Sequence, residues 1–249
     1  MSLIIKEVHA KSVLSKSGIP GADYCLNPYT GCSHACRYCY ATFMKKYTNH
    51  PEPWGTFVDV KVNAPEVLKK QLGRARKGTV MVSSVTDAYQ PVEATYRLTR
   101  QCLGVLLEHQ FPVSILTKSP LVVRDADLLA QFEDVDVGLT ITTDDERMRK
   151  IFEPYASPIT ERVKALRELH EKGIRTYVFI GPLLPMDPDV LVDLIRPSAE
   201  YVYISRMNYY SKTAHLFDRL KLRQWLDKGF TGTIVERLKK GFGKQASLC

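Results

Sequence analysis

The sequence predicts an α/β protein built around a parallel sheet. Short apolar runs of the strand type alternate along the chain with amphipathic segments of helical period. These segments are long enough to be the helical crossovers that join parallel strands. The runs are apolar throughout, which is typical of parallel strands buried on both faces. With 249 residues, 45% of them hydrophobic, the chain can bury a large core as one barrel or as two smaller domains.

Six strands are each expected to precede a helix. Their ranges are 22–27, 79–85, 112–117, 135–143, 174–181 and 201–207. The helices are expected at about 38–47, 65–76, 91–109, shortly after 120, 159–172, 188–195 and 212–227. The alternating run 56–63 predicts a half-buried or edge strand in an insertion. Six such units form either an open doubly wound sheet or an incomplete barrel, and in both the chemistry lies at the carboxyl ends of the strands.

Composition divides the chain into three parts. We predict an N-terminal extension (1–21), a core (22–210) and a basic helical segment with a tail (211–249). The net charge is +8, and residues 212–244 hold nine Lys or Arg against three Asp or Glu. A solvated helix face and a nucleic-acid footprint both fit this excess. No apolar run is long enough for a signal peptide or a bilayer span, so we expect a cytoplasmic protein away from membranes.

The stretch NPYTGCSHACRYCYA (27–41) has a cysteine spacing that indicates a metal site. Cys32, Cys36 and Cys39 are spaced C-x3-C-x2-C, and three thiolates can hold three irons of a [4Fe–4S] cluster while the fourth iron stays open. A structural zinc site is the alternative, but it usually takes four ligands in two close pairs. Zinc would have to recruit a further ligand, from Cys25, His34 or His50. The spacing favours the cluster. The other cysteines, Cys25, Cys102 and Cys249, are scattered and indicate no disulfide framework.

This loop, with Tyr38 just before its last cysteine, resembles the radical S-adenosylmethionine (SAM) superfamily. The wider string, together with SSVTDAYQPVE (83–93) and EPYASPITERVKAL (153–166), resembles the spore photoproduct lyase-like branch, also called DNA repair photolyase-like. The likeness covers about residues 10–210. It implies a partial (β/α)6 TIM-type barrel with parallel strands. It also implies a cluster that accepts an electron from a flavodoxin- or ferredoxin-type reductant and cleaves SAM to a 5′-deoxyadenosyl radical.

The resemblance also suggests where SAM binds, and it leaves the catalytic residues unknown. The expected SAM-binding residues are Tyr38, Ser83, Ser84, Thr86, Asp87, Lys118, Thr140, Thr142 and Gly181. The group 83–87 stands where many members place a Gly-rich motif for the methionine ammonium, although Ser and Asp also cap such turns. Lys118 suits the carboxylate, and the two threonines share one strand face. Tyr38 and Gly181 are expected near the adenine. Glu153 and Arg162 are expected either to form a structural pair or to hold the SAM end of the barrel, and the structural role is favoured.

One departure limits what the resemblance implies about the reaction. Spore photoproduct lyase has a cysteine hydrogen donor at the end of the second strand, and SSVTD (83–87) has none. We therefore expect a lyase- or transferase-type radical SAM enzyme that acts on a nucleic-acid or nucleotide-derived substrate, but not repair of the spore photoproduct. The alternatives are a peptide or small-metabolite substrate, or an iron–sulfur or zinc protein without SAM chemistry. Cys249 could act as a donor, but a disordered tail is the expectation there.

Overall fold

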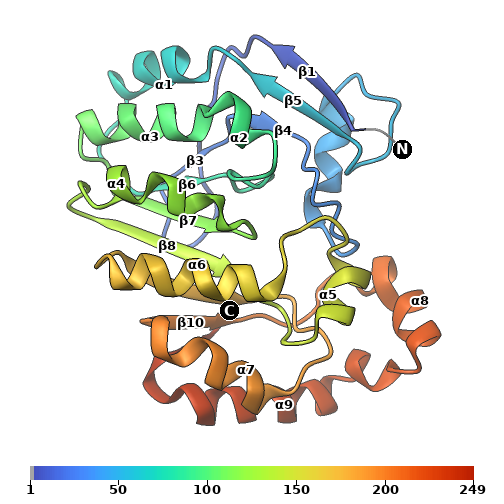
Figure 1. Cartoon of the computed structure of the whole chain (residues 1–249). Helices are drawn as coiled ribbons and strands as arrows, with labels where there is room; N and C mark the ends of the chain where they lie inside the picture. The colour runs from blue at the N-terminus through green and yellow to red at the C-terminus, as the bar shows by residue number, and fades with distance from the viewer. Residues whose placement is uncertain (1–2) are drawn as a thin grey trace.

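The computed structural model describes residues 3–249 and contains one large, open sheet (Figure 1). Its eight strands lie in the order β11-β10-β9-β8-β7-β6-β3-β2, and all neighbours are parallel except β2 and β3. The strands are β2 (Leu14–Lys16), β3 (Tyr24–Leu26), β6 (Val80–Val82), β7 (Val113–Thr117), β8 (Val135–Thr140), β9 (Arg175–Ile180), β10 (Tyr201–Ile204) and β11 (Ala246–Leu248). The sheet does not close, so the predicted partial barrel with parallel strands is confirmed.

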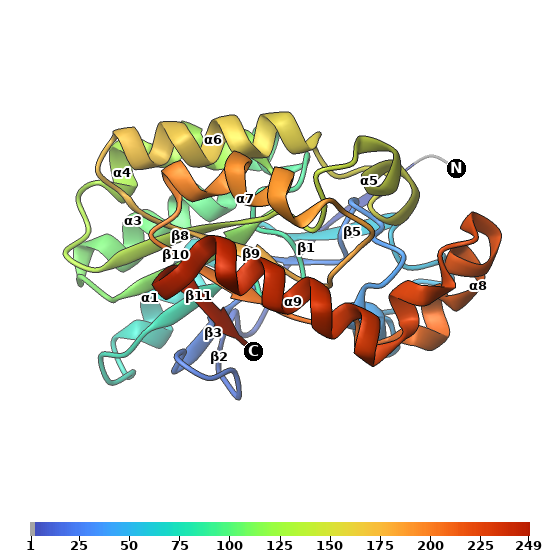
Figure 2. The ribbon, with the colours of Figure 1, turned by 90° about the horizontal axis from the view of Figure 1, so that it is seen from below.

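Helices follow the strands in the manner of βα units (Figures 1 and 2). The α-helices are α1 (Ala64–Leu72), α2 (Glu93–Tyr96), α3 (Leu98–Glu108), α4 (Ala126–Leu129), α5 (Glu146–Phe152), α6 (Ile159–Glu171), α7 (Pro188–Ile195), α8 (Tyr210–Leu220) and α9 (Lys228–Phe242). The 3₁₀ helices are η1 (Tyr40–Tyr47), η2 (Pro120–Asp125), η3 (Arg196–Ser198), η4 (Arg223–Leu226) and η5 (Gly243–Gln245). Among residues 3–249, no helix combines the length and the apolar character needed to cross a membrane.

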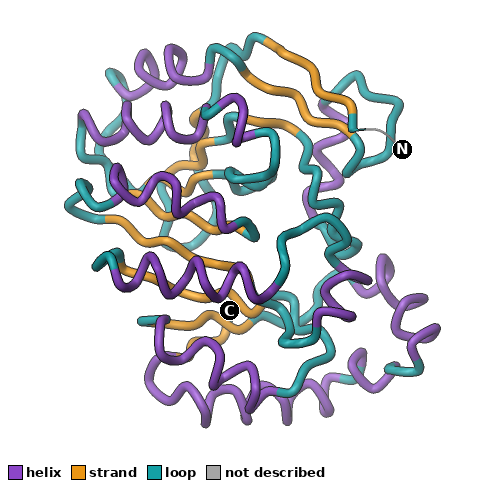
Figure 3. The backbone as a smooth tube through the Cα atoms, in the orientation of Figure 1, coloured by secondary structure: helices purple, strands orange, loops and turns teal. Residues whose placement is uncertain are grey.

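The two faces of the sheet carry different side chains because alternate residues of a strand point to opposite sides. One face is a continuous apolar layer: Val82 pairs with Ile115, which pairs with Val137, and all three are fully buried. This layer belongs to the main core, which the helices share. The opposite face curves around a cavity at the carboxyl ends of the strands. Figure 3 shows the loops that follow the strands gathered at that end.

The N-terminal residues are part of the fold. Strand β1 (Ile4–Val8) pairs with β5 (Phe57–Lys61), and β2 forms one edge of the main sheet. The prediction of a half-buried or edge strand at 56–63 is only partly correct. β5 is the central strand of a small sheet of order β1-β5-β4, with β4 at Tyr29–Thr30. Its Phe57, Val58 and Val60 are fully buried because this sheet has its own small core.

Four other expectations need correction. The helix expected at 212–227 is α8 followed by the 3₁₀ helix η4, because Lys221 adopts a left-handed conformation with φ 57°. The helix expected at 91–109 is two helices, because Arg97 adopts a left-handed conformation with φ 52°. The segment 38–47 is a 3₁₀ helix that begins only at Tyr40. The expected disordered tail is wrong: α9 is followed by β11, which pairs with β10, and the Cys249 amide donates to Ile204 O at 3.0 Å.

Candidate active site

A cavity of about 250 Å³ lies at the carboxyl ends of the parallel strands. The three cysteines of the C-x3-C-x2-C loop line it together with the ends of β6, β7, β8 and β9 and the segment after β10. Its walls include Cys32, His34, Cys36, Tyr38, Cys39, Tyr40, Met81, Ser83, Ser84, Thr86, Asp87, Leu116, Lys118, Thr140, Phe179, Gly181, Arg206 and Tyr209. This is the position at which parallel α/β folds place their chemistry.

The cysteine loop is held in one conformation by long-range contacts. Gly31 opens it with φ 88°, and a Cβ there would lie 2.3 Å from Phe57 O, so only glycine fits. The Ser33 amide donates to Gln90 Oε1 at 2.9 Å, and the Arg37 amide donates to Phe152 O at 2.8 Å. The loop is thus fixed at both halves before any ligand binds.

The chemistry of the three thiols fits a cationic metal cluster. Burial raises the pKa of Cys36 to about 12 and also raises the pKa of Cys32. A bound cation compensates that cost, because the thiolate is the metal-binding form. Within residues 3–249, no three Cys, His, Asp or Glu side chains gather as closely as one metal ion requires. A [4Fe–4S] cluster takes one thiolate on each of several irons, so its ligands need only face the same space.

Tyr38 connects the cysteine loop to a buried ion pair. Its hydroxyl donates to Glu153, whose Oε2 lies 2.6 Å from Arg162 Nη2, and both charged side chains are fully buried. Arg162 also donates to Thr140 O at 2.9 Å. Burial opposes the charged form of Glu153, but Arg162 and Lys118 outweigh it and lower the pKa of this carboxyl. The pair therefore joins the loop, β8 and α6, in line with the predicted structural role.

Thr142 does not line the cavity with Thr140. Its hydroxyl turns to Glu153 and donates to Oε1 at 3.1 Å, and the residue is fully buried beyond the end of β8. The expectation that both threonines face the pocket is therefore wrong for Thr142. Sequence alternation placed them on one face, but the strand ends at Thr140 and the alternation ends with it.

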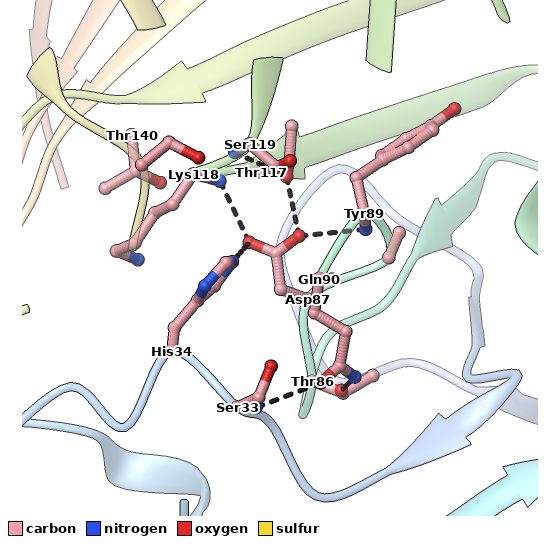
Figure 4. A network of polar contacts seen from close by, with 12 residues as sticks. Ser33, His34, Thr86, Asp87, Tyr89, Gln90, Thr117, Lys118, Ser119 and Thr140 are labelled. Carbon is pink, nitrogen blue, oxygen red and sulfur yellow. Dashed lines mark hydrogen bonds and ion pairs between the residues drawn. The ribbon is translucent and has the colours of Figure 1, made fainter. Parts of the chain in front are cut away.

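Asp87 is a hub of polar contacts (Figure 4). Its Oδ1 accepts from Thr117 Oγ1 at 2.6 Å and from the Tyr89 amide at 2.9 Å. Its Oδ2 accepts from the Lys118 amide at 2.9 Å and lies 3.2 Å from His34 Nε2. Burial alone would raise the pKa of Asp87, but the charge of His34 and these donors lower it. Because both oxygens are occupied, Asp87 ties the cysteine loop to β7 and is not the free acceptor that the sequence suggested.

Ser83 and Lys118 are the polar groups best placed to meet a ligand. Ser83 follows β6 with φ 68°, and its buried Oγ has no hydrogen-bond partner within residues 3–249. A buried hydroxyl without a partner is costly, and a ligand in the cavity would relieve that cost. Lys118 Nζ lies 5.8 Å from the centroid of the Tyr38 ring. Burial opposes its charge, but the charges of Cys36 and Glu153 raise the pKa of Lys118 above its usual value.

The structure brings eight of the nine expected SAM-binding residues to the cavity, all except Thr142. Their contact with SAM stays a prediction. Sequence reasoning missed the apolar walls Met81, Leu116 and Phe179. Each stands two residues before a predicted site residue, so strand alternation could have found them. It also missed Tyr40, although that residue directly follows Cys39 in the cysteine loop, and it missed Arg206 and Tyr209, which carry no sequence signal for the cavity.

Comparison with known proteins agrees with this geometry. The family model described as the radical SAM superfamily matches residues 26–196, more than half of the chain. The chain belongs to the radical SAM superfamily. Membership implies a [4Fe–4S] cluster and SAM as cofactors, and the three cysteines and the cavity beside them fit both. The resemblance noted from the sequence is therefore confirmed.

Several curated proteins are similar to this radical SAM protein. An uncharacterised protein of Methanocaldococcus jannaschii is 39% identical over 206 residues, which cover 82% of this chain and 78% of the relative. An uncharacterised protein of Mycobacterium tuberculosis is 34% identical over 74% of this chain, and the chain spans only 57% of that relative. A protein of Pseudomonas phage M6 named radical SAM Nalpha-GlyT isomerase is 25% identical over 88% of this chain and 43% of its own length.

Solved structures show the same fold. Spore photoproduct lyase complexed with dinucleoside spore photoproduct matches with a TM-score of 0.70 at 12% identity, covering 98% of this chain and 81% of the lyase. A variant of that lyase was solved with bound AdoMet and matches with a TM-score of 0.66. Streptococcus suis SuiB bound to S-adenosylmethionine matches with a TM-score of 0.56 at 14% identity, and the chain spans half of it. At these identities the likeness concerns the fold alone.

Proposed function

We propose that this radical SAM enzyme cleaves SAM at a [4Fe–4S] cluster held by Cys32, Cys36 and Cys39, and abstracts hydrogen from a nucleic-acid or nucleotide-derived substrate. The observation that carries the proposal is the cavity itself. Three thiols, the Lys118 ammonium and the unpartnered Ser83 hydroxyl face one space at the carboxyl ends of parallel strands. The reaction is of the lyase or transferase type.

When bound, the cluster and SAM supply the radical chemistry: one electron breaks a carbon–sulfur bond and gives methionine and a 5′-deoxyadenosyl radical. The electron comes from a one-electron donor of the flavodoxin or ferredoxin type. The chain's own residues bind SAM and orient it. Lys118, kept charged by its surroundings, suits the SAM carboxylate. Ser83 Oγ is free to accept a hydrogen bond from the methionine ammonium.

The remaining wall shapes the space for the adenosine and keeps water out. Met81, Leu116 and Phe179 are apolar, and water exclusion protects a reactive species from side reactions. Gly181 stands beside Phe179, where a Cβ would lie 2.4 Å from the phenyl ring, so no side chain fits at this edge. Tyr38, held by Glu153, offers an aromatic face near Lys118.

Two observations support a substrate that contains nucleobases. The first is that the solved structures of the same fold include a lyase complexed with a dinucleoside photoproduct. The second is the basic segment 212–244, with nine Lys or Arg against three Asp or Glu. Along the chain it follows the segment after β10 that lines the cavity. A peptide substrate is the alternative, since the structure of SuiB bound to its precursor peptide SuiA matches with a TM-score of 0.53.

Hydrogen transfer from labelled substrate tests the proposal. The protein, reconstituted with iron and sulfide under anaerobic conditions, is incubated with SAM, dithionite and DNA or RNA from cells grown in deuterated medium. We expect deuterium in the 5′-deoxyadenosine that forms. Deuterium that enters 5′-deoxyadenosine from deuterated peptides, but not from nucleic acid, would favour a peptide substrate. Formation of 5′-deoxyadenosine without label from any nucleic acid would contradict the proposed substrate class.

A further inference from the structure

Exposed aromatic rings stand at the rim of the cavity. Tyr40 and Tyr209 both line it, yet they are 43% and 44% exposed. Their ring centroids lie 6.4 Å apart and their planes are only 17° from parallel. Phe43 lies beside Tyr40, with 6.5 Å between the centroids, and is 47% exposed. Large apolar surface gathered at one place on a protein marks a binding site.

The two rings are fixed in position although they come from distant parts of the chain. Tyr40 follows the last cluster cysteine, and its hydroxyl donates to the carbonyl of Ser84. Tyr209 precedes α8, and the next turn carries Lys212, whose Nζ donates to Cys39 O at 2.5 Å and to Thr42 Oγ1 at 2.6 Å. This lysine thus clamps the start of α8 to the cysteine loop. Rigid rings lose little conformational freedom when a ligand stacks on them.

Positive charge adjoins the rings. Lys212 Nζ lies 5.4 Å from the centroid of the Tyr209 ring. Arg206 lines the cavity, and its buried Nε has no hydrogen-bond partner within residues 3–249. The basic helices α8 and α9 continue from this point, and Figure 2 shows them following one another along one side of the molecule. A ligand with flat rings and a polyanionic backbone matches both the aromatic surface and the charge.

We propose that Tyr40 and Tyr209 form a stacking platform for a nucleobase that has left its stack, with phosphates of the same strand bound by Arg206 and the basic segment 212–244. The proposal rests on the proposed function and specifies the form of its substrate, a single-stranded or locally unpaired nucleic acid. Stacking on aromatic side chains accepts any base and contributes about 1–3 kcal/mol per base. A duplex whose bases remain paired and stacked offers no free base face to the platform.

Base stacking is measured directly with a fluorescent base. The reconstituted protein with SAM is titrated with a short single-stranded oligonucleotide that contains 2-aminopurine. We expect quenching of the fluorescence in the wild-type protein and in Tyr209→Phe. Tyr209→Leu and Tyr209→Ala lose the quenching and bind about 5- to 150-fold more weakly, as a stacking contribution of about 1–3 kcal/mol implies. Tyr47→Ala is the matched control, because Tyr47 is 69% exposed on η1 but does not line the cavity.

The outcomes separate this inference from the proposed function. Oligonucleotide binding that stays equally tight and equally quenched in folded Tyr209→Leu, or that falls as much in Tyr47→Ala, would overturn the platform. Binding of paired duplex as tight as that of single strands would also overturn it. Failure of the wild-type protein to transfer label from any nucleic acid, with 5′-deoxyadenosine still formed, contradicts the substrate class instead.

Discussion

Replacing Arg162 by methionine is expected to destabilise the protein strongly, because it leaves a carboxylate without its partner in the core. Arg162 and Glu153 are both fully buried, and their nearest atoms are 2.6 Å apart. Methionine keeps most of the apolar volume of the arginine stem. The loss of unfolding free energy therefore reflects mainly the uncompensated charge of Glu153. The hydrogen bonds that Arg162 donates to Thr140 O and Ser157 O, at 2.9 Å each, are lost with it.

The size of the effect follows from the burial of the pair. Removing one partner of a buried ion pair costs about 3–5 kcal/mol, and the two carbonyls share the same site, so their cost does not simply add. For a chain of this size, that loss lowers the melting temperature by about 6–20 °C. Arg175 pairs with Asp134 and Asp136 but is 46% exposed, so Arg175→Met is the matched control and is expected to cost at most about 1 kcal/mol.

The dependence of the unfolding free energy on pH tests whether the buried charge of Glu153 is the cause. In the wild-type protein the pKa of Glu153 is lowered from 4.5, so its ionised form stabilises the fold above that pH and the contribution is lost as pH falls through the lowered pKa. In Arg162→Met the buried carboxyl has lost its directly paired cation and keeps only the more distant charge of Lys118, so its protonation at low pH relieves the cost of the buried charge. Urea unfolding should thus show the largest difference near neutral pH and a smaller one below about pH 4.5. A loss under about 1 kcal/mol, or one independent of pH, would refute the reasoning.

Three further substitutions test the cofactor site. Cys36→Ala should abolish iron and sulfide incorporation, measured by metal and sulfide analysis. Cys249→Ser should retain both, because Cys249 follows β11, is exposed and lies outside the cavity lining. Lys118→Met should weaken SAM binding about 10- to 100-fold in calorimetric titration, as expected for a lost charge-assisted hydrogen bond, and an unchanged affinity would remove Lys118 from the site. Gly181→Ala should lower the unfolding free energy by about 1–3 kcal/mol and weaken SAM binding, because its Cβ would lie 2.4 Å from the Phe179 ring. Wild-type stability together with wild-type SAM affinity would show that the cavity wall adapts to the extra methyl group.

The βα units of the core were predictable because their signals are local. Apolar runs and helical periods located the six parallel strands from β3 to β10, and the cysteine spacing located the metal loop. Strand β11 was missed because three residues near the end of the chain carry no pattern of their own. It forms because α9 packs closely on α7: a Cβ on Gly241 would lie 2.6 Å from Val192 Cγ2. That contact returns the chain to β10, and only tertiary structure reveals it.

The candidate site shows the same limit. Sequence position identified Ser83 and Lys118 as lining residues because both follow strands whose carboxyl ends face the cavity. It could not show that Asp87 is already occupied by Thr117 and His34, since these partners lie 30 and 53 residues away along the chain. It could not find Tyr209 either, because the approach of that ring to the cysteine loop depends on how α8 docks.

Iron, sulfide and SAM turnover in one sample of anaerobically reconstituted protein test the central claim most directly. We predict about four irons and four sulfides per chain, and formation of 5′-deoxyadenosine and methionine when SAM and dithionite are added. All three signals should vanish together in Cys36→Ala. Protein that instead binds zinc without sulfide, and leaves SAM intact under reducing conditions with every candidate substrate, would contradict the account.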